Sequence, residues 1–280
     1  MSWFDALCHG FATVSTGGFS THDASFGYFK QPLLHWIAIL FMILGSLPFV
    51  LMIKAARGKP LALLRDPQVV LFLAIMLAVS LLLAGWIAIA QYLAPLEALR
   101  LAAFNVVSIV TTTGFVNADY TLWGAFPVGV FFLLLFVGGC SGSTSGAIKI
   151  YRFQVLWLMA RTHLLLLLEP RRVIVPSYAG HPLPADVPVA VLAFMSAYVA
   201  SVVVLGLGLS ALGFDFLVAM SVAAAALGNV GPALGAEFGP SGTFAPLSDT
   251  GKWMLSGAML LGRLELFTVL VLLEPRFWRD

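Results

Sequence analysis

The sequence contains few charged residues and few cysteines. Only 10% of its 280 residues are charged, whereas 60% are apolar, and the mean hydropathy is +0.98. Because soluble domains carry about 25% charged residues, this composition excludes an ordinary soluble protein and indicates an integral membrane protein. Two cysteines, Cys8 and Cys140, are too few for the disulfide framework of a small secreted domain.

Motifs of familiar enzymes are also missing from the sequence. The five histidines form no metal-ligand spacing, and neither a Ser-His-Asp ordering nor a helical His-Glu-x-x-His motif occurs. We therefore expect no catalytic residues and no cofactor bound by this chain.

Apolar stretches of two lengths alternate along the chain. Five are long enough to cross about 30 Å of hydrocarbon, which takes roughly 20 residues: 35–56, 68–92, 125–159 with an interruption, 187–212 and 253–273. Three are too short and too mixed in composition to span: 5–14, 96–110 and 216–227. We predict an all-α protein with about five spanning helices and three re-entrant half-helices.

Basic residues predict the orientation, because Lys and Arg accumulate on the cytoplasmic side of a membrane. One side would carry Lys54, Arg57, Lys59, Arg65, Arg161, Arg171, Arg172, Arg276 and Arg279. The other side, from which the half-helices enter, would carry Lys30, Arg100 and Lys252 against Asp5, Asp23, Glu97, Asp119, Asp215, Glu237 and Asp249. An outer mouth with an excess of acidic residues would concentrate cations.

Each predicted half-helix is followed by a segment of small residues and then by a long apolar stretch. The three segments are 15–19, 111–115 and 228–232, and they align on Gly18, Gly114 and Gly231. The third copy departs most, since Asn229 and Val230 replace threonines. This repeat predicts hairpins of helix, re-entrant helix, small-residue segment and helix. We divide the chain into a partial hairpin at 1–60 and complete hairpins at 67–165 and 187–275.

The small-residue segments have the composition of an ion filter. A dehydrated potassium ion needs oxygen ligands, which channel filters supply mainly as backbone carbonyls, and glycine allows the backbone angles that aim such carbonyls into one path. Threonine hydroxyls could add ligands or brace the turns. The predicted filter residues are Ser15, Thr16, Gly17, Gly18, Thr111, Thr112, Thr113, Gly114, Gly228, Asn229, Val230 and Gly231.

The third long stretch is interrupted by nine residues of Gly, Ser, Thr and Cys that disfavour a helix. They are Gly138, Gly139, Cys140, Ser141, Gly142, Ser143, Thr144, Ser145 and Gly146. Non-helical backbone at membrane depth must lie against protein or a wet cavity. Arg263 lies inside the last apolar stretch, where a guanidinium normally faces the protein interior; snorkelling to the interface is the alternative.

These segments, together with Gly262-Arg263-Leu264-Glu265, resemble the membrane subunit of the bacterial Trk/Ktr potassium transporters, in particular the TrkH branch, over essentially the whole chain. The resemblance implies four hairpins around one potassium pathway, of which this chain supplies the second, third and fourth filter segments. It also implies a gate formed by residues 138–146 beneath the filter, with Arg263 donating hydrogen bonds to this loop. The filter would then hold potassium as the transported ion.

The same resemblance implies a multi-pass protein of the bacterial inner membrane, working as a homodimer with a cytoplasmic nucleotide-binding ring of the TrkA type. Contact with membrane lipid is expected, and contact with nucleic acid is not. Whether transport is passive or coupled to protons or sodium stays open. The resemblance also implies that this chain is the C-terminal portion of a longer protein and that the first pore hairpin is missing from the portion given.

The amino-acid sequence leaves three alternative functions open. The transported ion could be sodium or ammonium. A membrane-embedded enzyme could instead use Lys149, Arg152 and Arg263 to hold an anionic substrate. Residues 138–149 could also form a phosphate-binding loop, although the order Gly-Lys-Ser/Thr of that motif is missing.

Overall fold

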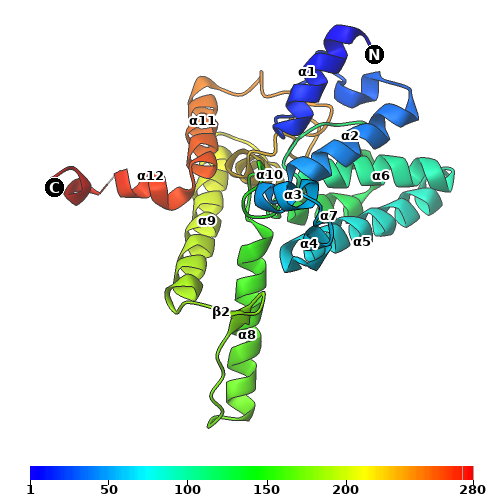
Figure 1. Cartoon of the computed structure of the whole chain (residues 1–280). Helices are drawn as coiled ribbons and strands as arrows, with labels where there is room; N and C mark the ends of the chain where they lie inside the picture. Colours follow the sequence, from blue (N-terminus) through cyan, green and yellow to red (C-terminus); the bar gives the residue numbers. More distant parts are fainter. Residues whose placement is uncertain (273, 280) are drawn as a thin grey trace.

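The computed structural model describes residues 1–272 and 274–279, and helices form nearly all of its regular structure (Figure 1). The helices are α1 (Trp3–Val14), α2 (Pro32–Gly45), α3 (Phe49–Ala56), α4 (Leu61–Arg65), α5 (Pro67–Ala90), α6 (Pro95–Val110), α7 (Ala125–Leu134), α8 (Ile150–Leu168), α9 (Asp186–Ala211), α10 (Phe216–Gly228), α11 (Asp249–Arg263) and α12 (Leu266–Leu272). Three 3-10 helices are η1 (Ser25–Tyr28), η2 (Tyr120–Trp123) and η3 (Pro275–Trp278). Strands β1 (Ser177–Tyr178) and β2 (His181–Pro182) pair antiparallel, with Ser177 opposite Pro182.

Local signals place the start of each half-helix. Helix α1 begins with a capping box, in which Ser2 and Asp5 accept each other's backbone N–H groups. Helix α6 begins at Pro95, whose fixed φ suits a first helical position. The Asp215 carboxylate accepts the Leu217 N–H at the start of α10. The observed half-helices agree within two residues with the predicted stretches.

Two of the half-helices, α6 and α10, form the centre of the molecule, whereas α1 lies at its edge with Trp3 and Phe11 exposed. Every side chain from residue 102 to 110 of α6 is buried, and so is every one from residue 221 to 228 of α10. Helix α6 packs against α5 and α2, and α10 packs against α9 and α11. The surrounding helices leave apolar side chains such as Leu81 and Val204 exposed, as expected for surfaces that face lipid.

Two helices, α5 and α9, are long and apolar enough to cross a membrane unbroken, and up to four spans result if two bent pairs each count as one. The all-α fold is confirmed, but within the described residues two of the five predicted stretches, 35–56 and 253–273, are bent rather than continuous. Helices α2 and α3 meet at 106°, and α11 and α12 meet at 109°. Pro48 explains the first bend, because proline has no N–H and disfavours a helical residue before it.

The second bend has no proline. Glu265 lies at this bend with φ +61°, a conformation that L-residues other than Asn and Asp rarely adopt. The charged residues Arg263 and Glu265 were the only sequence signal for this break. Residue 273, the predicted end of this stretch, lies outside the described residues.

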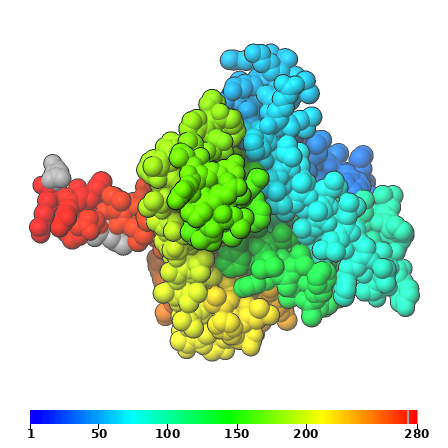
Figure 2. Space-filling view, turned by 90° about the horizontal axis from the view of Figure 1, so that it is seen from below, coloured from blue at the N-terminus to red at the C-terminus, as the bar shows by residue number. Residues whose placement is uncertain are grey.

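The predicted interruption of the third stretch is present. Helix α7 ends at Leu134 and α8 begins at Ile150, and residues 138–146 between them are not helical. In Figure 1, α8 starts near the centre of the molecule and runs to a free end, and the short β hairpin lies beside the helix before that end, where the Tyr178 hydroxyl donates to the Gln154 amide oxygen at 2.6 Å. Helix α12 projects away from the other helices in both Figure 1 and Figure 2. The division into hairpins 1–60, 67–165 and 187–275 stays a prediction.

Candidate functional site: three glycine turns and an intramembrane loop

The three small-residue segments adopt the same backbone conformation. Thr16, Thr112 and Asn229 have φ values of 51°, 56° and 53°, and the aligned glycines also have positive φ. In each copy an N–H bonds back to the helix carbonyl five residues earlier: Gly17 to Ala12, Thr113 to Ser108 and Val230 to Ala225, at 2.7–2.9 Å. These bonds are those of the Schellman motif, which ends a helix with a left-handed residue. The sequence repeat is therefore also a structural repeat.

Successive turns contact each other through their glycines. A β-carbon added to Gly18 would overlap the Thr113 carbonyl oxygen, and one added to Gly114 would overlap the Val230 carbonyl oxygen. In both cases the residue that carries this carbonyl oxygen immediately precedes the aligned glycine of the next copy. A β-carbon on Gly231 would meet no described heavy atom within 4 Å. The three turns thus form an arc with an open side at Gly231.

The turns enclose a cavity of about 590 Å³. From the predicted filter set, Ser15, Thr16, Gly17, Gly18, Thr113, Gly114, Asn229, Val230 and Gly231 line it, together with Phe19, Ala225, Met259 and Arg263. The half-helices α1, α6 and α10 all end at this cavity, and a helix C-terminus carries partial negative charge. This field favours a cation in the cavity.

Three predicted filter residues, Thr111, Thr112 and Gly228, do not line the cavity. The Thr111 hydroxyl donates to the Ser108 carbonyl oxygen and lies 2.8 Å from the Thr113 hydroxyl oxygen. The Thr112 hydroxyl accepts the Gly146 N–H at 2.6 Å, and the Gly228 carbonyl accepts the Ala147 N–H at 3.0 Å. The second and third turns therefore bind the loop 138–146 directly.

The opposite side of this loop is held by the end of α2. The Gly45 carbonyl accepts both the N–H and the hydroxyl of Thr144, the latter at 2.9 Å. Ser46 accepts the Cys140 N–H through its carbonyl, and its hydroxyl oxygen lies 2.7 Å from that of Ser145. The break between α2 and α3 thus exposes carbonyl groups that a continuous helix would have used. Ser46 was not predicted from the sequence to contact the loop. Its position two residues before Pro48, where a helix must end, was the available signal for carbonyl and hydroxyl groups free to bind another segment.

Arg263 joins the loop to the filter cavity. Its Nη1 donates to the Thr144 carbonyl at 2.9 Å, so the structure contains the hydrogen bond that the resemblance implied. Arg263 lines the filter cavity and also a second cavity of about 310 Å³ formed by residues 142–147 and their neighbours. It is the one described residue that the two cavities share. Its role in gating stays a prediction.

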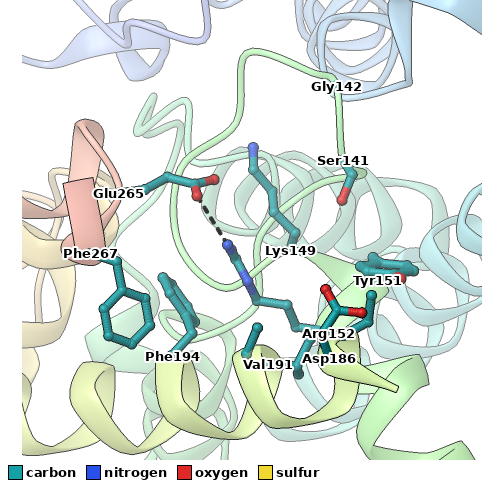
Figure 3. Close-up of a pocket in the computed structure, with 12 residues that line it drawn as sticks. Ser141, Gly142, Lys149, Tyr151, Arg152, Asp186, Val191, Phe194, Glu265 and Phe267 are labelled. Atoms are coloured by element: carbon teal, nitrogen blue, oxygen red, sulfur yellow. Dashed lines mark hydrogen bonds and ion pairs between the residues drawn. The ribbon is translucent and has the colours of Figure 1, made fainter. Parts of the chain in front are cut away.

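The residues after the loop form a separate polar cluster (Figure 3). Arg152 of α8 donates to the Glu265 carboxylate at 3.2 Å, and its guanidinium lies 3.6 Å from the centre of the Phe194 ring. Lys149 donates to the Ser145 carbonyl. These residues border a pocket of about 390 Å³, whose wall includes Ser141 and Asp186. Arg152 and Lys149 therefore have partners within the chain.

Comparison with known proteins is consistent with this geometry. The family model described as TrkH, cation transport protein, matches residues 1–279. The chain is 51% identical to the Trk system potassium uptake protein TrkI of Halomonas elongata, covering 100% of this chain and 57% of that protein. It is 42% identical to the TrkH protein of the same organism, covering 100% of this chain and 58% of that protein.

A solved structure shows the same fold. The crystal structure of the potassium transporter TrkH from Vibrio parahaemolyticus superposes with a TM-score of 0.92 at 38% sequence identity, over 99% of this chain and 60% of that one. The chain therefore spans less than two thirds of the length of these relatives. The match of the family model over nearly the whole sequence establishes that this chain belongs to the TrkH cation transport family.

Proposed function

We propose that this chain contributes three of the filter turns and the gate of a potassium uptake pathway in the bacterial inner membrane. The observation that carries the proposal is the arc of three turns with matching positive-φ residues and backbone hydrogen bonds around one cavity, each at the C-terminal end of a half-helix. Backbone carbonyls and negative helix ends suit a dehydrated monovalent cation. The relatives' names specify potassium uptake.

Residues 138–146 and Arg263 form the gate in this proposal. The loop is bound to two filter turns and to the end of α2. Arg263 lies between the cavity lined by the three turns and the smaller cavity lined by residues 142–147. A guanidinium at this point repels a cation leaving the filter. Conduction then requires Arg263 and the loop to move together, because the Thr144 carbonyl links them.

A fourth turn completes the filter in our proposal. The open side at Gly231 is where the succession of glycine and carbonyl contacts stops. Gly18 and Gly114 each contact the carbonyl group of the residue that precedes the glycine of the next turn. If a fourth turn continues this pattern, its carbonyl group contacts Gly231, and its own glycine contacts the Gly17 carbonyl. The part of the relatives' length that this chain does not match is the natural source of such a turn.

The proposed assembly is a homodimer with a cytoplasmic nucleotide-binding regulatory subunit of the TrkA type. We assign the dimer contact to helix α12, because it projects from the other helices; in a single copy its exposed Phe267, Leu270 and Val271 would face lipid. A second copy would bury this apolar surface. The chain itself acts as a transporter subunit and not as an enzyme, since its family is one of cation transport and Arg152 and Arg263 already bind groups within the chain.

Rubidium uptake tests the proposed function. The complete reading frame that encodes this chain is expressed in a bacterium deficient in potassium uptake, and saturable rubidium entry is measured with sodium or ammonium as competitor. Uptake that resists excess of both competitors supports a potassium pathway. Uptake abolished by sodium or by ammonium would instead identify that ion as the substrate.

A further inference from the structure

A buried polar network joins the first two filter hairpins away from the cavity. At its centre is His35 of α2, which is only 3% exposed. One ring nitrogen, Nδ1, lies 3.0 Å from Nη1 of Arg100 and 3.3 Å from Nδ2 of Asn117. The other, Nε2, lies within 3.2 Å of the Phe26 and Phe29 carbonyl oxygens.

These partners fix the chemical state of His35. A guanidinium has only donors, so Nδ1 must accept from Arg100. Nε2 must then carry the proton and donate it to the two carbonyls. His35 is therefore neutral in this arrangement. Its Nε2 donates to carbonyl groups of the first hairpin, and its Nδ1 accepts from side chains of the second hairpin. Protonation at Nδ1 would place an N–H against the Arg100 guanidinium.

The network lies close to both filter turns along the chain. Phe26 belongs to η1, which follows the first turn, and Asn117 lies three residues beyond Gly114. Two backbone contacts join the same segments: the Gly27 N–H donates to the Val116 carbonyl at 3.1 Å, and the Val116 N–H donates to the Ser25 hydroxyl at 3.2 Å. His35 therefore reinforces a direct junction between the two post-filter segments.

The surrounding packing leaves little room for adjustment. The Phe26 ring lies 4.7 Å from that of Phe115 and 5.2 Å from that of Phe104, measured between ring centres. Asn105, which is fully buried, donates to the Asn117 amide oxygen at 2.7 Å. Close-packed interiors transmit displacements rather than absorbing them, so a shift at this junction reaches the contact between Gly18 and Thr113.

We propose that His35, through Arg100 and Asn117, is a positioning residue that sets the spacing of the first and second filter turns and thereby the preference for potassium over sodium. This inference rests on the proposed function. Sodium is the smaller ion, so a filter whose turns are no longer held at one spacing discriminates against it less.

His35→Leu and His35→Gln test the inference in the complete protein. Leucine removes both hydrogen-bonding directions, whereas glutamine keeps one acceptor and one donor. We expect His35→Leu to lower the sodium concentration that inhibits rubidium uptake by about tenfold, the size of effect expected when a hydrogen bond to a charged group is lost. His35→Gln should stay close to the unmodified protein. Uptake is normalised to the amount of protein in the membrane.

His9→Leu is the matched control. His9 is equally buried, and its ring packs against Phe26 and, across the junction, against Phe115, but its polar contacts, Asp5 and Ser20, lie within the first hairpin. This variant therefore separates the packing of a buried ring from the polar link between the hairpins. Removing His9 should leave the ratio of sodium to rubidium affinity unchanged. An equal loss of discrimination in His9→Leu and His35→Leu would reduce His35 to general packing and overturn the inference.

Other outcomes also decide the question. Reduced uptake with unchanged discrimination in His35→Leu overturns the inference while leaving the proposed function intact. Absence of rubidium uptake by the unmodified protein overturns both. If His35→Leu does not reach the membrane, Asn117→Ala, which removes one of the two donors from the other hairpin, is judged by the same ratio.

Discussion

At the scale of single residues, the proposed filter turns depend on backbone conformations that most side chains disfavour. Gly18 and Gly114 combine positive φ with a neighbouring carbonyl where a β-carbon would lie. Gly231 has the same positive φ but open space beside it. Gly18 and Gly114 are therefore required both by backbone conformation and by lack of space, whereas Gly231 is required by backbone conformation alone. Substitution should affect the three positions differently.

Gly114→Ser should raise sodium permeation. Its side chain would displace the Val230 carbonyl, at a cost of about 1–3 kcal/mol for overpacking, and a displaced carbonyl no longer holds potassium at its best distance. The measurement is rubidium uptake in the presence of sodium. Gly85→Ala in α5, where a β-carbon would meet nothing within 4 Å, is the control for expression. Unchanged discrimination in Gly114→Ser would remove residue 114 from the filter.

Thr112→Val should loosen the gate and leave the filter turn in place. Valine keeps the shape of threonine but leaves the buried Gly146 N–H without its acceptor, which costs about 1–3 kcal/mol. We expect a higher basal leak of rubidium with little change in discrimination. The measurement is rubidium efflux from preloaded vesicles. A leak equal to that of the unmodified protein would show that this hydrogen bond does not hold the gate closed.

The sequence predicted where the turns lie but not how their threonines are used. Composition and spacing identified Gly18, Gly114 and Gly231, because a recurring glycine after a half-helix is a local signal. The hydroxyl of Thr112 faces the loop rather than the cavity, and that depends on a contact between residues 112 and 146. Sequence alone gives no distance between segments so far apart along the chain.

At the scale of elements, α11 contacts successive parts of the pathway. The Met259 carbonyl accepts from the Asn229 side chain in the third turn, and Gly262 lies against the Leu227 carbonyl at the end of α10. Arg263 reaches the loop, and Glu265 at the bend reaches α8. One helix thus connects the filter, the gate and the helix that follows the gate.

Arg263→Ala should increase basal cation leak. It removes the positive charge between the two cavities and the donor to the Thr144 carbonyl, so a cation meets a lower barrier below the filter. Arg263→Lys should leak less than Arg263→Ala, because it keeps the charge. Arg161→Ala, in the part of α8 beyond the gate, controls for the loss of an arginine. Equal leak in Arg263→Ala and the unmodified protein would assign Arg263 a structural role.

The bends show what periodicity and length could not predict. The stretches 35–56 and 253–273 have the length and mean hydropathy of single spans, although the second contains Arg263 and Glu265. The first bend has a local cause in Pro48. At the second bend, Glu265 has positive φ and pairs with Arg152 of α8, a residue 113 positions away that the sequence does not identify as its partner. Element type was predictable from local composition, whereas the bends that position the gate partners were only partly so.

At the scale of the whole molecule, the three hairpins form an incomplete enclosure. Contacts run from the first turn to the second and from the second to the third, and Gly231 faces an open side. The family assignment and the coverage of the relatives are consistent with the prediction that this chain carries the later hairpins of a longer pore. The proposed uptake activity accordingly belongs to the complete protein.

The most direct test of the central claim is sodium competition with rubidium uptake by the complete reading frame, with and without Gly114→Ser. We expect saturable uptake that persists in excess sodium and loses this resistance in Gly114→Ser. Uptake equally resistant to sodium in both proteins, or no uptake by the unmodified protein when it is present in the membrane, would contradict the assignment of these turns to a potassium filter.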